Sequence, residues 1–132
     1  MATITYTVTV ASGTNQYGTG NKFYINGAVS PDLNLVEGNT YIFDQSDSTN
    51  GTGGGHPLRF STSANNSPAA PYTTGVTTTG TPGSSGANTT ITVATYAPTL
   101  YYYCSNHAGM GATAFTPAAG SISNQATFES TF

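Results

Sequence analysis

A chain of 132 residues is the right length for one domain with one hydrophobic core. Its two basic residues, Lys22 and Arg59, stand against five acidic ones, which excludes binding to nucleic acid or to a membrane surface through positive charge. Only 5% of the residues are charged, yet nine Tyr and six Phe give the chain the aromatic content of a folded β protein rather than a disordered one.

The first third of the chain predicts a series of short strands. Residues 3–10, TITYTVTV, alternate Thr with apolar side chains, which is the pattern of a strand with one buried face. Residues 21–27, NKFYING, predict a second strand after a segment rich in turn residues. Two more strands are indicated by the leucines of 33–35 and the aromatic residues of 41–43, with a turn at 37–39 between them.

The middle of the chain is poorer in apolar residues. Residues 56–61, HPLRFS, predict one further strand. The glycines at 51–55 that precede it predict a loop, and no Lys-Ser/Thr pair follows them to make a phosphate site. Residues 62–88 consist mostly of small and polar residues and predict a long connection, which packs on the domain through Tyr72 and Val76.

Strong strand patterns return near the C-terminal end. Residues 89–95, TTITVAT, and 100–104, LYYYC, each predict a strand. The three tyrosines of the second are typical of a half-buried strand with alternate rings in the core. Residues 113–132 predict either a closing strand or an arm that docks on a neighbouring chain. The apolar side chains that would form this closing strand are Ile122, Ala126 and Phe128.

These elements predict an all-β fold, with one domain over residues 1–132 built as a β-sandwich of about seven or eight short strands. We expect no transmembrane helix, because no apolar run approaches the roughly 18 residues that one needs. The start, MATITYTVTV, has no basic region, continuous apolar segment or cleavage site, so we also expect no signal peptide.

One segment concentrates the residues that could carry chemistry. YYYCSNHAGMGA, at 101–112, contains the only Cys of the chain, one of its two His residues and its only Met besides Met1. Cys104, His107 and Met110 are spaced three residues apart, so a tight loop between two strands would let their side chains converge. The second His is His56, at the start of a predicted strand.

A thiolate, two imidazoles and a weak thioether are the ligands of a blue-copper centre. We therefore predict one copper site formed by His56, Cys104, His107 and Met110. The alternative is structural, because a lone buried Cys commonly packs as a small apolar residue. We expect no enzymatic activity, since two His and five acids form no catalytic triad or zinc motif without using these residues.

On these residues the chain resembles the cupredoxins, a family of small blue-copper proteins. The resemblance spans nearly the whole chain: a predicted β-sandwich, an early lone His, and a late Cys-His-Met loop after an aromatic strand. The chain is more closely similar to cupredoxin-like domains encoded by bacteriophages of marine bacteria. The segments that carry this similarity are TYIFDQSDSTNGTGGGHPLRFSTS, TPGSSGA and YYYCSNHAGMG.

The cupredoxin resemblance implies a Greek-key sandwich and a role for each ligand. Cys104 would be a metal-bound thiolate, His56 the more buried imidazole, and Met110 the weak axial ligand. His107 would lie nearer the surface, where electrons could pass. Many cupredoxins have an Asn after the first His that helps to tie the two ligand loops together, whereas Pro57 stands in that place here.

The phage resemblance implies a structural virion protein of a tailed bacteriophage, such as a capsid decoration or a component of a fibre or appendage. We expect it on the exposed surface of the particle, bound to capsid or tail proteins as a homo-oligomer or on a lattice. The alternative is a soluble blue-copper electron-transfer protein. A third hypothesis is compatible with the virion role: copper only stabilises the domain, by joining the two segments that carry the ligands.

Overall fold

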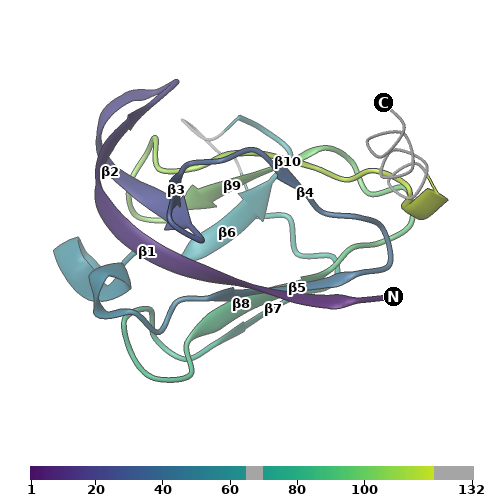
Figure 1. The fold of residues 1–132 in the computed structure, drawn as a ribbon, viewed down its shortest axis with the longest axis horizontal. Coiled ribbons are helices and arrows are strands. Elements are labelled where there is room, and N and C mark those ends of the chain that lie inside the picture. The colour runs from purple at the N-terminus through teal and green to yellow at the C-terminus, as the bar shows by residue number, and fades with distance from the viewer. Residues whose placement is uncertain (65–69, 121–132) are drawn as a thin grey trace.

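A computed structural model describes residues 1–64 and 70–120 of the chain. Within these ranges the backbone forms two mixed sheets, of six and four strands, that pack as a β-sandwich. The all-β prediction is therefore confirmed, and Figure 1 shows the two layers. No helix in the described ranges is both long enough and apolar enough to cross a membrane.

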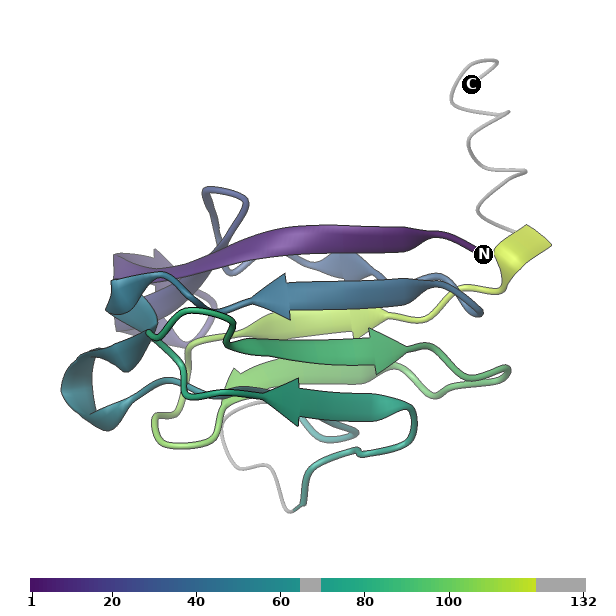
Figure 2. The same ribbon diagram turned by 90° about the horizontal axis from the view of Figure 1, so that it is seen from below.

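The six-stranded sheet runs in the order β3-β2-β1-β5-β8-β7. Its strands are β1 (Thr3–Asn15), β2 (Gly18–Ile25), β3 (Ala28–Val29), β5 (Thr40–Asp44), β7 (Val76–Thr79) and β8 (Asn88–Thr92). Residues 3–7 of β1 pair in parallel with β5, and residues 8–15 pair antiparallel with β2. The long β1 therefore joins the two halves of this sheet. Figure 2 shows β1, β5, β8 and β7 one beside the next.

The four-stranded sheet runs in the order β4-β10-β9-β6. Its strands are β4 (Leu33–Asn34), β6 (Leu58–Ser61), β9 (Leu100–Cys104) and β10 (Ala112–Phe115). β9 pairs antiparallel with both β6 and β10. Because Leu58 lies opposite Cys104, the end of β9 lies beside the start of β6.

The core lies between the two sheets, and pairs of aromatic rings connect one sheet to the other across it. Phe43 of β5 meets Phe60 of β6 edge to face, with ring centroids 5.5 Å apart. Phe23 of β2 and Tyr102 of β9 have their centroids 6.4 Å apart. All four side chains are fully buried. Each pair connects one sheet to the other, so burial of aromatic surface holds the two layers together.

The structure adds elements that the sequence pattern did not predict. The described ranges contain ten strands, more than the seven or eight expected, and two of these are only two residues long. β7 lies in the long connection 62–88, and β10 begins the C-terminal segment. The expected closing strand through Ile122, Ala126 and Phe128 lies outside the described residues.

The glycine-rich segment before His56 forms 3₁₀-helical turns, η1 (Ser48–Gly54), where the sequence predicted a loop. Asp47 caps its start by accepting the backbone N–H of Thr49 at 2.9 Å. Gly53 and Gly54 have φ values of 57° and 89°, which glycine adopts at little cost. The turns therefore depend on the same glycines that suggested an irregular loop.

Candidate metal centre

Three of the four predicted ligands meet at one end of the four-stranded sheet. One ligand atom each from His56, Cys104 and His107 lies within 4.8 Å of the other two. His56 comes just before β6, and Cys104 ends β9, so the antiparallel pairing of these strands brings the two together across 48 residues of sequence. His107 follows on the loop after β9.

Sulfur and nitrogen atoms converge in this group. The Sγ of Cys104 lies 3.6 Å from Nδ1 of His56 and 3.6 Å from Nδ1 of His107. The two imidazole rings are tilted by 43°, with centroids 4.6 Å apart. His56 and Cys104 are buried and His107 is half-buried. A soft thiolate beside two imidazoles fits a transition metal such as copper or zinc.

Thr52 of η1 offers a hydrogen-bond acceptor to one nitrogen of the His56 ring and so favours one tautomer. Its Oγ1 donates to the carbonyl oxygen of Thr49 at 2.8 Å, which leaves a lone pair on Oγ1. His56 Nε2 lies 3.4 Å from that oxygen and can donate an N–H to it in the tautomer that carries its proton on Nε2. Nδ1 of His56 then carries the lone pair and faces the Sγ of Cys104.

A buried polar network fixes the backbone around His56. Gln45, which is 1% exposed, donates from Nε2 to the His56 carbonyl oxygen at 2.6 Å and to Oδ1 of Asn50 at 3.0 Å. Its Oε1 accepts the N–H of Leu58 at 2.9 Å. The fully buried Asn50 accepts the His56 N–H at its carbonyl and donates from Nδ2 to the Val8 carbonyl. This network ties the His56 backbone to β1 of the opposite sheet.

The two ligand segments are also joined directly. Asn106 donates from Nδ2 to the Gly55 carbonyl at 3.0 Å, while its backbone N–H points to the Sγ of Cys104 at 3.4 Å. The Ser105 N–H donates to the Pro57 carbonyl at 3.1 Å. Pro57 has no amide side chain with which to make such a tie, and here the tie is donated from the Cys104–His107 loop instead.

Burial shifts the pKa values of Cys104 and His56. It raises the pKa of the Cys104 thiol, an effect that the backbone N–H groups of Asn106 and His107 and the charge of Arg59 partly oppose. The pKa of His56 is lowered, first by burial and then by the nearby His107. In the metal-free protein these shifts favour a neutral thiol beside a neutral His56 imidazole. A metal ion that binds here must displace the thiol proton.

Met110, the fourth predicted ligand, is 1% exposed and belongs to the same hydrophobic cluster as Cys104. Its carbonyl oxygen accepts hydrogen bonds from the Phe23 N–H and the Ser30 hydroxyl, each at 3.0 Å. The backbone at Met110 is therefore held in place beside the core. That its thioether completes the site stays a prediction.

The sequence predicted the candidate ligands but not the residues that support them. Asn106 carried a usable signal, because it lies between two predicted ligands. Thr52, Gln45 and Asn50 carried none, since polar residues are common throughout this chain and only the fold brings these three to His56.

Comparisons with known proteins find no family model, no curated protein and no solved structure that matches this chain. Function therefore has to be inferred from the donor atoms and their surroundings. The arrangement can bind one metal ion through one sulfur and two nitrogens, in a site where two of the three ligands are shielded from water.

Proposed function

We propose that this chain is a copper-binding domain of the cupredoxin type. One type 1 copper site would be formed by His56, Cys104 and His107, with Met110 as a weak fourth ligand. The observation that carries this proposal is the convergence of one Cys and two His ligand atoms within 4.8 Å at one end of a β-sandwich.

The donor set favours copper over zinc. A structural zinc site takes four strong ligands in a tetrahedron, whereas only three His, Cys, Asp or Glu residues gather at this point of the described chain. Met110, which is buried in the same hydrophobic cluster as Cys104, would be the fourth ligand, and a thioether suits copper better than zinc. The burial of Cys104 also suits a soft ion.

The protein would hold its ligands in place before the metal binds. Copper, when bound, supplies one-electron exchange. Thr52 and the Gln45–Asn50 network hold His56, and the Asn106 backbone N–H points to the Cys104 sulfur within the same loop. Little movement of these groups would then accompany a change of oxidation state. The half-buried His107 would be the ligand nearest to a partner that exchanges electrons.

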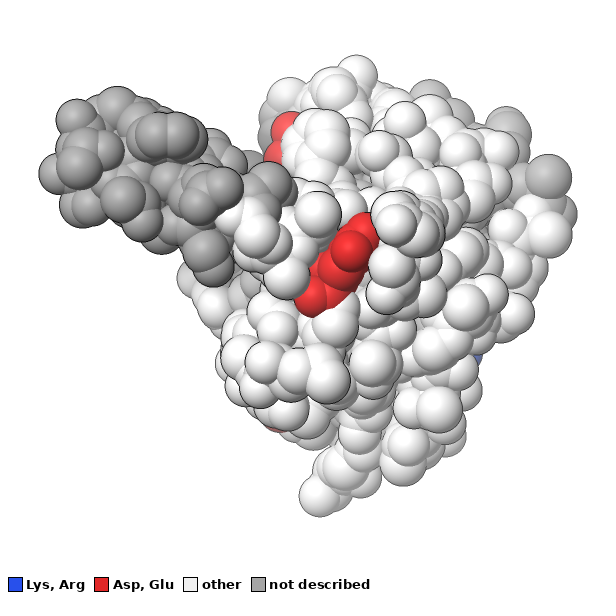
Figure 3. Space-filling model, turned by 90° about the vertical axis from the view of Figure 1, so that its right-hand side faces the viewer, with Lys and Arg blue, Asp and Glu red and all other residues white. Residues whose placement is uncertain are grey.

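For the biological setting, we propose a structural virion component of a tailed bacteriophage that binds capsid or tail proteins. The support is the phage resemblance together with the scarcity of charge. Figure 3 shows a face on which acidic side chains form small patches and nearly all of the remaining described surface is uncharged. Such a surface suits fixed contacts with a protein lattice better than long-range attraction to a charged redox partner. The half-buried His107 supports the alternative, a soluble electron-transfer protein.

The metal site can be tested by titrating the purified, reduced protein with Cu(II) and recording visible absorption. We expect an intense blue charge-transfer band that saturates at one copper per chain and is absent from Cys104→Ser. His56→Ala and His107→Ala should each weaken or abolish the band. A protein that stays colourless and retains no stoichiometric copper would overturn the proposal.

The proposed virion role needs an experiment separate from the copper titration. Stable co-purification with phage capsid or tail proteins would support the virion role. Fast electron exchange by a free monomer, with no assembly, would support the soluble carrier instead.

A further inference from the structure

The loop that carries His107 and Met110 is held by its backbone as well as by its side chains. Three consecutive carbonyl oxygens, those of residues 109, 110 and 111, accept hydrogen bonds from β1, β2 and the turn after β3. The donors are Lys22 Nζ to Gly109 at 2.7 Å, Asn15 Nδ2 to Gly109 at 2.8 Å and to Gly111 at 3.4 Å, and the Phe23 N–H and Ser30 Oγ to Met110, both at 3.0 Å. This end of the six-stranded sheet therefore fixes the path of the loop.

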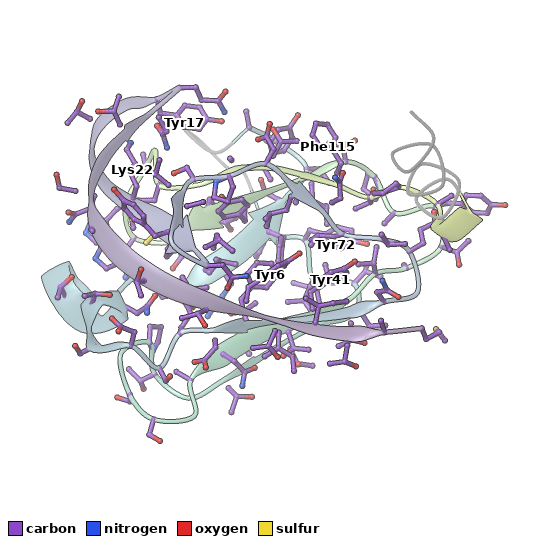
Figure 4. All side chains as sticks on the ribbon, viewed as in Figure 1. Tyr6, Tyr17, Lys22, Tyr41, Tyr72 and Phe115 are labelled. Atoms are coloured by element: carbon purple, nitrogen blue, oxygen red, sulfur yellow. The ribbon has the colours of Figure 1, made fainter. Side chains whose placement is uncertain are left out.

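Lys22 is the unusual member of this group. It is one of two basic residues in the chain and is only 3% exposed. Within the described residues it donates to a carbonyl oxygen rather than to a carboxylate. Burial lowers its pKa, which reflects the cost of keeping an ammonium away from water. Figure 4 shows Lys22 on β2.

The hydrogen bond alone does not explain a lysine at this position. Asn15 already donates to the same Gly109 oxygen from a neutral amide. A neutral or apolar side chain at position 22 would avoid the cost of burying a charge. What Lys22 adds is a positive charge beside the backbone that joins His107 to Met110.

We propose that Lys22 tunes the copper site by placing a buried positive charge next to its ligand loop. This inference rests on the proposed copper site. Oxidation of bound copper adds one positive charge, and a nearby cation disfavours that change in an interior where water and salt screen weakly. Lys22 therefore favours Cu(I) over Cu(II) and raises the reduction potential. It acts through its charge and through Gly109, not as a ligand.

The test compares the wild type with Lys22→Gln, Lys22→Met and Lys22→Arg. Gln keeps a donor without the charge, Met removes both, and Arg keeps the charge. Competition titrations give the Cu(I) and Cu(II) affinities separately, and a redox titration gives the potential. For Gln and Met we expect the ratio of Cu(I) to Cu(II) affinity to fall about tenfold, which corresponds to about 59 mV for one electron. Arg should restore the wild-type ratio.

Glu37→Gln is the control for a change of one charge unit elsewhere on the chain, because Glu37 lies just before the start of β5 and η1 follows the opposite end of that strand. It should leave the ratio unchanged. If Met alone changes the ratio and Gln behaves as wild type, Lys22 acts only as a donor and the tuning role is wrong. Equal ratios in all four proteins would overturn it as well. If the wild type binds no copper, the proposed function itself fails.

Thermal unfolding of the metal-free variants shows which of them fold. Should Lys22→Met not fold, the pair of Lys22→Gln and Lys22→Arg still decides the matter, because these two differ in charge while each keeps an N–H donor in its side chain.

Discussion

For the Cys104 side chain, metal binding would require the loss of the thiol proton. The His56 tautomer that Thr52 favours presents a lone pair on Nδ1, 3.6 Å from the Cys104 Sγ, so that the thiol S–H can donate to it. Burial raises the pKa of that thiol and keeps the proton in place. A metal ion that removes the proton finds sulfur and nitrogen already facing each other, and this limits the reorganisation that binding requires.

The tautomer argument predicts that Thr52→Val lowers copper affinity by about tenfold, because His56 loses the acceptor for its Nε2–H. Val has nearly the shape of Thr and suits the extended backbone at this position, where φ is −74° and ψ is 160°. A competition titration against a copper chelator measures the change. Thr78→Val, on the exposed strand β7, is the matched control and should bind as the wild type does. Equal affinities in the two variants would show that Thr52 does not orient His56.

Among the elements, η1 covers the His56 side of the site and depends on an acidic cap. The Thr49 hydroxyl and backbone N–H hold the pKa of Asp47 below its usual value. A carboxyl whose pKa is lower in the folded state than in the unfolded state stabilises the fold above the unfolded value. That contribution is lost as the pH falls through the folded value.

Asp47→Asn should therefore flatten the acid side of the stability curve. Asn caps as well as Asp but does not titrate, so the variant should be close to the wild type in stability at neutral pH. Below about pH 4, the wild type should lose stability more steeply than the variant. Urea denaturation of the metal-free proteins at several pH values measures this. Parallel curves would show that the cap does not contribute to acid sensitivity.

Gly111, directly after Met110 and just before β10, leaves no room for a side chain beside β9. A Cβ at this position would overlap the Tyr102 carbonyl oxygen, and backbone cannot move aside as a flexible side chain can. Gly111→Ala should lower the free energy of unfolding by about 3 kcal/mol or more, and should weaken copper binding because Met110 shifts with the strand. Gly120→Ala, whose added Cβ would meet no atom within 4 Å, is the control. Similar unfolding curves for both variants would contradict this account.

The strands that the sequence predicted are those with large apolar side chains at alternate positions. β1, β5 and β9 follow this pattern, and their inward residues form the core. β7, VTTT, has one apolar residue, and β10, ATAF, buries only alanines, so neither gave a signal above its surroundings. Both are strands because a neighbour, β8 or β9, offers them backbone partners.

The candidate site also has a part that the sequence predicted and a part that it did not. Its ligands could be predicted because Cys and His are rare here and the spacing around Cys104 is regular. Its supports could not, because Lys22 lies 87 residues from Gly109 in the sequence and Asn50 lies 42 residues from Val8. Such pairs form only when the chain folds, and no local pattern encodes them.

For the whole molecule, the site joins segments that the fold already anchors in two places. Asn50 ties the His56 segment to β1, and Lys22 ties the Cys104–Met110 loop to β2. A metal ion held by both segments resists separation of either from the six-stranded sheet. A ligand that binds only the folded state raises stability by mass action, by about 2.7 kcal/mol at 100 times its dissociation constant.

We therefore expect copper to raise the midpoint of thermal unfolding by about 10 °C for a chain of this length. Calorimetry with Cu(I) under reducing conditions measures this without oxidising Cys104. Cys104→Ser should show little or no increase at the same copper concentration, because only nitrogen ligands remain to hold the ion. An equal increase in both proteins would mean that copper binds elsewhere on the chain. An increase confined to the wild type, in a protein that exchanges electrons slowly, would favour copper as a stabiliser of a particle-bound domain over copper as an electron carrier.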